Sequence, residues 1–413
     1  MTFPIAAHLS RRLPLHTRRL LSTMTAPTPP PAAPTSTVTK LPLTNAPPSP
    51  TSHHVLDKAG NRLKFRNPDP SFGPPMSNFQ IASAFYTARL AGEVTWPSTA
   101  TTIIPSVPPH FLPTRFPPPT SLRATWLGHA CALTEFPSGL RVLFDPVFEP
   151  RCSPLSFLGP SRYSPAPCAP AAIPLVDAVV ISHSHYDHLS RASVVALAAR
   201  HPAAQFFVGL GLAGWFRACG IERVTEMDWW EGAELVVTTE DGGRRVEARV
   251  ECLPAQHTSG RTGLDKDVTL WASWAVRSGG KAVWFAGDTG YRAVPRLGAG
   301  VDDYGEEFAG LPRCPGFREI GERRGPFDLG LIPIGAYNPR FVMSPMHANP
   351  FDAVEMFKDT RCKRAIGIHW GTWVLTVEPP EEPPMVLREA LKRSGIAEEG
   401  VFDVCKLGES KEY

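Results

Sequence analysis

The sequence predicts an α/β protein whose buried strands end on histidine and aspartate side chains. Mostly apolar runs at residues 176–181, 281–286 and 364–368 are short, which is typical of strands buried on both faces. The first run leads through a histidine-rich turn into residues 190–200, which have helical spacing and composition. No repeat with a period of 20 to 50 residues is present, so a solenoid or a propeller is not expected.

The elements follow from the same patterns, taken along the chain. Asp187 or Ser190 can cap the helix at residues 190–200. Residues 137–139 predict a turn between strands at 123–130 and 140–146. Residues 291–325, rich in Gly, Pro and charge, predict a surface insertion. Further strands are expected at 205–209, 222–224, 233–239, 245–253 and 328–334, and further helices at 213–218, 350–360 and 384–394.

The N-terminal part differs in composition from the rest. Residues 1–55 contain no Asp or Glu but four arginines and one lysine, which resembles a mitochondrial transit peptide. A disordered basic tail is the alternative. Residues 26–51 are mostly Pro, Ala, Thr and Ser, which predicts a disordered linker. We therefore expect a targeting leader and linker at 1–60, one folded domain at 61–400 and a tail at 401–413.

Charge and cysteine content exclude several classes of protein. The formal net charge is +3, and the leader's basic residues account for it, so the remainder carries about −2. This balance argues against a nucleic acid partner. No run of 18 apolar residues is present, so a membrane-spanning helix is not expected. The eight cysteines form no CxxC motif, which indicates reduced thiols.

Seven potential metal ligands follow four of the strand-like runs. The first run ends in the motif HxHxDH, and the others end near single residues: His183, His185, Asp187, His188, His257, Asp288 and His369. Imidazole suits zinc and a carboxylate can bridge two ions, so seven ligands suffice for a dinuclear site. Such a site activates water for hydrolysis.

Other readings of single residues stay open at this point. A lone histidine at a strand end, such as His369, is more often a core residue than a ligand, whereas three histidines in HxHxDH have no such structural explanation. His129 and Asp145 either cap a turn or support the metal ligands from outside. Trp229, Trp230, Trp271 and Trp274 are expected in the core.

These motifs resemble the metallo-β-lactamase-fold hydrolases, which implies an αββα sandwich of two mixed sheets flanked by helices. Within that superfamily, residues 63–395 are similar to the phospholipases D that hydrolyse N-acylphosphatidylethanolamine. The segments that carry this resemblance are FDPVF at 144–148, LGP at 158–160, DAVVISH at 177–183, FAGDTGY at 285–291, GPFDL at 325–329, IPIGAY at 332–337 and IHWGT at 368–372.

The resemblance implies roles for individual residues. His183, His185 and His257 would hold one Zn²⁺, and Asp187, His188 and His369 a second, with Asp288 as the bridge. Asp288, Asp187 and His347 would be catalytic, and Asp145, Ser156 and Tyr186 would lie in the outer shell or contact substrate. Animal members carry Gln-Tyr where this chain has Ser156-Phe157, so their phosphate contact does not transfer directly.

The expected function is therefore that of a two-zinc phospholipase D-type enzyme releasing N-acylethanolamine and phosphatidate. Another hydrolase of the same fold (a lactonase, thioesterase or nuclease) and a non-catalytic metal- or lipid-binding protein are the alternatives. A phospholipid substrate implies peripheral membrane contact, a homodimer is compatible with the sequence, and the leader favours a membrane-associated mitochondrial location over a cytoplasmic one. Six apolar residues could touch a membrane or pack in the core: Phe206, Phe207, Leu210, Leu212, Trp215 and Phe216.

Overall fold

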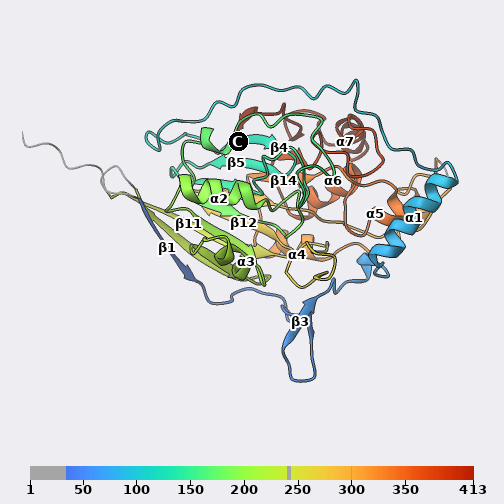
Figure 1. Ribbon diagram of the computed structural model, residues 1–413, viewed down its shortest axis with the longest axis horizontal. Helices are drawn as coiled ribbons and strands as arrows, with labels where there is room; N and C mark the ends of the chain where they lie inside the picture. Colours follow the sequence, from blue (N-terminus) through green and yellow to red (C-terminus); the bar gives the residue numbers. More distant parts are fainter. Residues whose placement is uncertain (1–33, 240–242, 299) are drawn as a thin grey trace, which may run out of the picture.

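A computed structural model describes residues 34–239, 243–298 and 300–413, so most of the expected leader lies outside the described residues. Two mixed β-sheets pack face to face, with helices on their outer sides (Figure 1). The predicted α/β sandwich is thus confirmed.

The first sheet has seven strands in the order β17-β4-β5-β6-β7-β8-β9. The pairs from β17 to β6 are antiparallel, and those from β6 to β9 are parallel. The strands are β4 (Arg123–Gly128), β5 (Cys131–Glu135), β6 (Arg141–Phe144), β7 (Ala178–Val180), β8 (Gln205–Gly209), β9 (Val224–Met227) and β17 (Ser410–Glu412).

The second sheet has eight strands in the order β1-β10-β11-β12-β13-β14-β15-β16, antiparallel up to β13 and parallel beyond it. Strands β11, β13 and β15 therefore run in one direction, and their carboxyl ends meet at one edge. The strands are β1 (Thr35–Lys40), β10 (Gly232–Thr238), β11 (Arg245–Leu253), β12 (Ser273–Ser278), β13 (Lys281–Phe285), β14 (Leu329–Pro333), β15 (Ala365–Ile368) and β16 (Phe402–Asp403).

Successive side chains of the central strands point to opposite faces, which divides the core in two. Phe144 and Val180 face the second sheet, whereas Leu143 and Val179 face outward. The outer face is covered by α2 (Arg191–Arg200) and α3 (Ala213–Ala218). These strands are therefore buried on both faces, as their uninterrupted apolar sequences predict.

The remaining helices pack around the second sheet and the molecule's edge (Figure 1). Helices α4, α6 and α7 contribute buried side chains to the large core. Their bounds are α1 (Asn78–Leu90), α4 (Gly316–Arg323), α5 (Arg340–Met343), α6 (Pro350–Asp359) and α7 (Glu382–Arg393), with short 3-10 turns at Pro70–Phe72, Pro170–Ala172 and Glu306–Phe308. A separate hairpin of β2 (His54–Leu56) and β3 (Arg62–Phe65) projects from the body.

Three expectations from composition need correction. Strand β1 lies within the expected disordered linker and pairs with β10 over six residues. The expected tail contains β16, which pairs with β15 in the eight-stranded sheet, and β17, which pairs with β4 in the seven-stranded sheet. The expected surface insertion contains α4, whose Phe317 and Ile320 are fully buried. In each case pairing or packing with distant segments overrides a local composition that favours a loop.

The six apolar residues near β8 belong to the core. Phe206, Phe207, Leu212 and Phe216 are buried, and Leu210 and Trp215 pack against buried neighbours. Of the two roles left open for this set, packing in the core is therefore confirmed: Phe206, Leu212, Trp215 and Phe216 lie in the core on the outer side of the seven-stranded sheet, and Phe207 and Leu210 in the core between the sheets.

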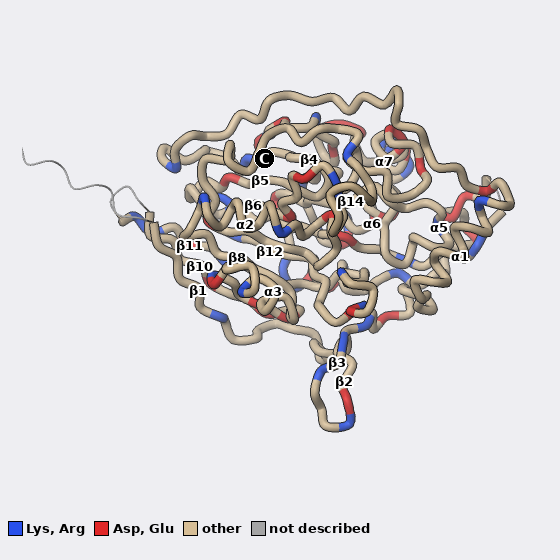
Figure 2. Tube along the Cα trace, in the orientation of Figure 1, with Lys and Arg blue, Asp and Glu red and all other residues tan. Residues whose placement is uncertain are grey.

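Charged residues are spread over the described chain, with Lys and Arg interspersed among Asp and Glu (Figure 2). In the ranges that the structure describes, no helix is both long and apolar enough to cross a membrane.

Candidate metal centre

The HxHxDH turn lies between β7 and α2, as the sequence predicts. The side chain of Ser190, rather than Asp187, caps α2 by accepting a hydrogen bond from the Ser193 amide. The turn thus leaves the end of a buried strand and enters a capped helix, which fixes its backbone at both ends.

One group of ligands consists of three histidines. The Nε2 atom of His183 lies 2.8 Å from Nδ1 of His185, and Nε2 of His257 lies 3.3 Å from that same Nδ1. His183 and His257 are buried and His185 is half-buried. Three imidazole nitrogens therefore converge, although His257 comes from the end of β11 in the other sheet.

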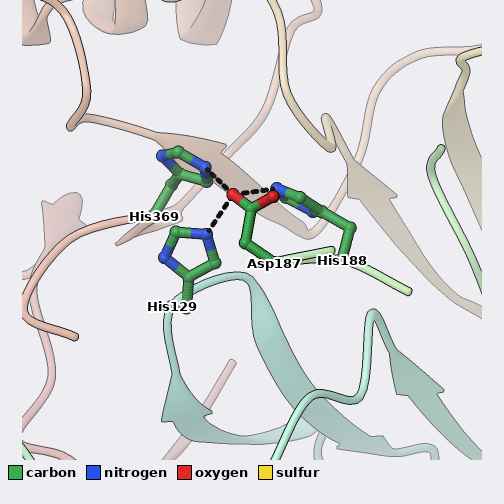
Figure 3. Close-up of side chains that lie close together, drawn as sticks. All are labelled: His129, Asp187, His188 and His369. Atoms are coloured by element: carbon green, nitrogen blue, oxygen red, sulfur yellow. Dashed lines mark hydrogen bonds and ion pairs between the residues drawn. The ribbon is translucent and has the colours of Figure 1, made fainter. Parts of the chain in front are cut away.

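A second group surrounds Asp187 (Figure 3). Its Oδ2 atom lies 3.0 Å from Nε2 of His129, 3.3 Å from Nε2 of His188 and 3.5 Å from Nε2 of His369. The structure thus brings together the three residues expected here and adds His129, whose sequence context left its role open.

Asp288 lies between the two groups. Its carboxylate is 3.1 Å from Nε2 of His188 and 3.0 Å from Nε2 of His369. It is also 3.7 Å from Nε2 of His257 and 4.0 Å from Nε2 of His183. One buried carboxylate therefore touches both sets of histidines, which is the position expected of a bridging ligand.

The donor set fits metal ions better than it fits hydrogen bonding alone. Nε2 of His188, Nε2 of His369 and Oδ1 of Asp288 are buried without a hydrogen-bond partner. Buried polar atoms normally have such partners, because an unmet one is costly. Imidazole nitrogens and carboxylate oxygens that converge in this way are suitable ligands for zinc and related divalent ions.

The protonation states prepare most ligands for metal. Burial lowers the pKa of His183 and His257 well below the usual range, so both rings are neutral. Burial opposes ionisation of Asp187 and Asp288, yet the adjacent His188 lowers the pKa of both carboxyls well below the usual range. For His369, burial is outweighed by Asp288 and Asp187, which raise its pKa to about 9. Metal binding must therefore displace a proton from this ring.

Groups behind the ligands fix their orientation. Asp145 lies 2.6 Å from Nδ1 of His188 and accepts a hydrogen bond of 2.7 Å from the Ser182 amide. Nδ1 of His257 donates to the main-chain oxygen of Met346 over 2.9 Å. Both contacts leave Nε2 as the free nitrogen of the ring, which selects the ligand atom.

Three residues of the site have backbone conformations that are rare for side-chain-bearing residues. His129, Asp145 and His369 have φ angles of 52°, 36° and 64°. Such angles cost free energy and persist where the surrounding structure enforces them, often at functional sites. At each of these residues the backbone turns sharply after a strand ends, so that the side chain faces the candidate metal centre.

His347 lies at the rim of this cluster. Its Nδ1 atom is 3.9 Å from Asp288, and its ring centroid is 5.0 Å from that of His257. Burial lowers the pKa of His347 to about 4, so its imidazole is neutral. Only the family resemblance pointed to this residue in the sequence, and the structure brings it to the predicted ligands.

A cavity of about 610 Å³ lies beside the HxHxDH turn, and both Ser156 and Tyr186 line it. Arg151, Arg191 and Arg261 also line it. The Arg261 guanidinium stacks over the Tyr186 ring at 4.0 Å. Sequence reasoning missed these arginines, since no local pattern distinguishes them from other surface arginines.

The comparison with known protein families agrees with this geometry. The beta-lactamase superfamily domain matches residues 140–370, a range that contains all seven predicted ligands. The chain belongs to the metallo-β-lactamase superfamily.

Similar proteins narrow the assignment within the superfamily. The chain is 39% identical over 297 residues to N-acyl-phosphatidylethanolamine-hydrolyzing phospholipase D 1 of Caenorhabditis elegans, covering 70% of this chain and 75% of that protein. It is 32% identical over 268 residues to the mitochondrial enzyme of that name from Saccharomyces cerevisiae, covering 63% of this chain and 51% of that protein. A UPF0173 metal-dependent hydrolase of Aeropyrum pernix is 29% identical over 266 residues, 63% of this chain and 87% of its own. The chain is thus a metallo-β-lactamase-fold hydrolase homologous to the N-acylphosphatidylethanolamine-hydrolysing phospholipases D.

Proposed function

We propose that this protein is a phospholipase D-type phosphodiesterase that hydrolyses N-acylphosphatidylethanolamine to N-acylethanolamine and phosphatidate, using two Zn²⁺ ions. The observation that carries the proposal is the position of Asp288 between two complete sets of ligands, with an arginine-lined cavity at Tyr186 of the HxHxDH turn. Homology to the worm and yeast enzymes supports the choice of substrate.

Two sets of residues would each bind one metal ion. His183, His185 and His257 would hold one ion, and Asp187, His188 and His369 the other, with Asp288 shared. When bound, the ions supply Lewis acidity toward a phosphoryl oxygen and make a water nucleophile available near neutral pH. In the tautomer that carries its proton on Nε2, His129 donates to the Asp187 carboxylate and so fixes the carboxylate's orientation.

The arginines of the cavity suit a phosphodiester. A guanidinium is always charged and binds phosphate oxygens through paired hydrogen bonds. Arg261 is held in place because its Nη1 donates to the main-chain oxygens of Ser184 and Leu189 over 2.7 and 2.8 Å. The Ser156 hydroxyl lines the same cavity, and together these groups would replace the phosphate contact that animal members make through Gln-Tyr.

In this proposal, His347 transfers protons and does not stabilise charge on the phosphate. Its neutral ring lies near Asp288 and can pass a proton between water and the leaving alkoxide. Because its pKa is about 4, the ring is not an imidazolium at neutral pH, so the proton that it passes to the leaving group originates from water.

Exposed apolar side chains at the cavity's rim suit a membrane surface. Leu155, Phe157 and Leu158 project from the loop that forms one wall, with Phe157 76% exposed. Leu264, 96% exposed, projects from the loop that forms the opposite wall. Insertion of these side chains among lipid tails would bring a headgroup to the cavity.

The proposed reaction is tested with the purified zinc-loaded chain and vesicles that contain N-acylphosphatidylethanolamine. Release of N-acylethanolamine is expected, and Asp288→Asn should lower it to the level of protein-free vesicles. Glu398→Gln, an exposed acidic control, should leave it unchanged. Turnover of lactones or thioesters without phospholipid cleavage would overturn the proposal.

The docking surface is tested by vesicle flotation. Phe157→Glu should weaken binding several-fold, whereas Ile103→Glu, an equally exposed apolar site far from the cavity wall, should not. Equal binding of both variants would count against a membrane role for this rim.

We also propose a mitochondrial location. The acid-free leader and the name of the yeast relative support it. Import of the full chain into isolated mitochondria with shortening is the expected result, and an unshortened cytosolic product would contradict it.

A further inference from the structure

We propose that the protein holds a further divalent metal ion, of the zinc class, between His53, His54 and Asp228. These residues lie outside the candidate metal centre. His53 and His54 stand at the start of the projecting hairpin, and Asp228 directly follows β9. Their ligand atoms lie within 4.8 Å of one another.

A single carboxylate faces both imidazoles. Nε2 of His53 lies 2.7 Å from Oδ1 of Asp228, and Nε2 of His54 lies 2.8 Å from Oδ2. The second contact is not a hydrogen bond, because Nε2 of His54 is buried without a hydrogen-bond partner. The ring nitrogen is therefore close to the carboxylate but does not point at it, as expected when both atoms face a common point.

The candidate metal centre shows the same arrangement. There, Nε2 of His369 lies 3.0 Å from Oδ1 of Asp288, and Nε2 of His188 lies 3.1 Å from Oδ2. Both nitrogens are buried without a hydrogen-bond partner, as Nε2 of His54 is. Close approach without hydrogen-bond alignment is thus common to the two clusters.

A metal-free reading accounts for only part of this cluster. His53 and Asp228 alone would form an ordinary buried imidazole–carboxylate pair. That pair leaves Nε2 of His54 unsatisfied, which carries a free-energy cost that an ion would remove. Two imidazoles and a carboxylate form a known ligand set for zinc, with one position left for water. The His54 side chain, 17% exposed, leaves the cluster within reach of solvent.

Aromatic packing holds the ligands in position. The His53 ring stacks on Trp229 with centroids 4.0 Å apart, and the Phe65 ring lies nearly parallel to the His53 ring with centroids 5.8 Å apart. The Trp229 amide donates to Oδ1 of Asp228 over 2.8 Å. Ligands that are fixed before the ion arrives bind it at a smaller entropic cost.

The ion would connect the N-terminal segment to the body and help to fix the position of His257, a predicted ligand of the candidate metal centre. The Arg66 amide donates to the main-chain oxygen of His53 over 2.8 Å. The adjacent Asn67 side chain bonds both main-chain groups of His257, at 2.8 and 3.1 Å. The site is therefore structural, and its existence does not depend on the proposed phospholipid reaction.

Crystals of the full chain grown with zinc test the proposal directly. Anomalous difference density at the zinc edge is expected between His53, His54 and Asp228, in addition to density at the Asp288 centre. This density should persist in Asp288→Asn, whose own centre loses metal. Its absence from wild-type crystals with a filled Asp288 centre would overturn the proposal.

Metal content in solution gives a second measurement. His54→Ala and Asp228→Asn should each bind one zinc equivalent per chain fewer than the wild type. Lys64→Ala, an exposed change on the same hairpin, serves as the control and should bind the wild-type amount. Equal zinc content in His54→Ala and wild type would also overturn the proposal.

Discussion

At the scale of single residues, the centre depends on side chains outside the seven predicted ligands. Asp145 shows this most clearly, because its carboxylate fixes Nδ1 of His188 while its own position is fixed by the Ser182 amide. It lies at a φ of 36°, where few residues with side chains are found. The conformational free energy of this φ angle is offset because the turn directs the Asp145 carboxylate to Nδ1 of His188.

Asp145→Asn should weaken metal affinity by about 10- to 100-fold, because an amide holds the His188 ring less firmly than a carboxylate does. Competition with a fluorescent chelator measures the change. Glu398→Gln provides the control, and an affinity equal to that of the wild type in Asp145→Asn would contradict the role given to this residue.

His201 provides a pH dependence that is independent of the metal ligands. It follows α2, is buried, and has an Nε2 atom without a hydrogen-bond partner. Burial lowers its pKa from 6.5 to about 4. Since the unfolded chain takes up this proton first, the stabilisation from the neutral ring is complete above about pH 6.5 and is lost as the pH falls toward 4.

Urea unfolding of the wild type and His201→Gln at pH 7 and pH 5 checks this prediction. The free energy of unfolding of the wild type should fall more between the two pH values than that of the variant. Loss of metal at pH 5 affects both proteins and cancels in the comparison. Parallel decreases would show that His201 does not titrate as stated.

At the scale of elements, local pattern predicts strands and helices that are continuous in sequence. The structure confirms a strand at Arg245–Leu253 and a helix at Ala213–Ala218, with the expected bounds. It also brings HxHxDH, His257, Asp288 and His369 to one site, because strands that run in one direction end at one edge.

The elements that sequence reasoning missed depend on distant partners. Strand β1 is polar and surrounded by prolines, and it is a strand because the open edge of β10 offers its main-chain groups. Helix α4 follows a glycine- and proline-rich stretch, and Phe317 and Ile320 on its apolar face are buried, with Phe317 against Trp284 of the second sheet. Neither partner can be read from the neighbouring sequence.

Val38→Asp should lower the free energy of unfolding by about 1–3 kcal/mol, because Val38 packs against the large core and a carboxylate there would be desolvated. Thr37→Asp, one residue earlier on the exposed face of the same strand, should change it by less than about 0.5 kcal/mol. Chemical unfolding compares the two. Equal effects would mean that β1 is not held against the core.

At the scale of the whole molecule, the ligands join the two sheets. The HxHxDH turn follows a strand of the seven-stranded sheet, whereas His257, Asp288 and His369 follow strands of the eight-stranded sheet. Each ion proposed for this centre would therefore bind residues from both halves of the sandwich, and its binding free energy would add to the stability of their association.

Chelation of the metal should therefore lower the thermal unfolding midpoint of the wild-type chain. An ion present at 100 times its dissociation constant stabilises the native state by about 2.7 kcal/mol. Calorimetry with and without EDTA measures the shift, and Asp288→Asn should show a smaller one. An identical midpoint for the metal-loaded and metal-free wild type would exclude an ion that binds both sheets.

The order of the ligands along the chain also has a consequence during synthesis. HxHxDH leaves the ribosome well before His369, since about 180 residues separate them, which corresponds to roughly ten to forty seconds of translation at typical rates. For that time the nascent chain carries a histidine cluster without the strand that completes its second coordination set. Binding of the second proposed ion would therefore follow translation of β15, whereas the three histidines proposed for the first ion are complete once His257 has been translated.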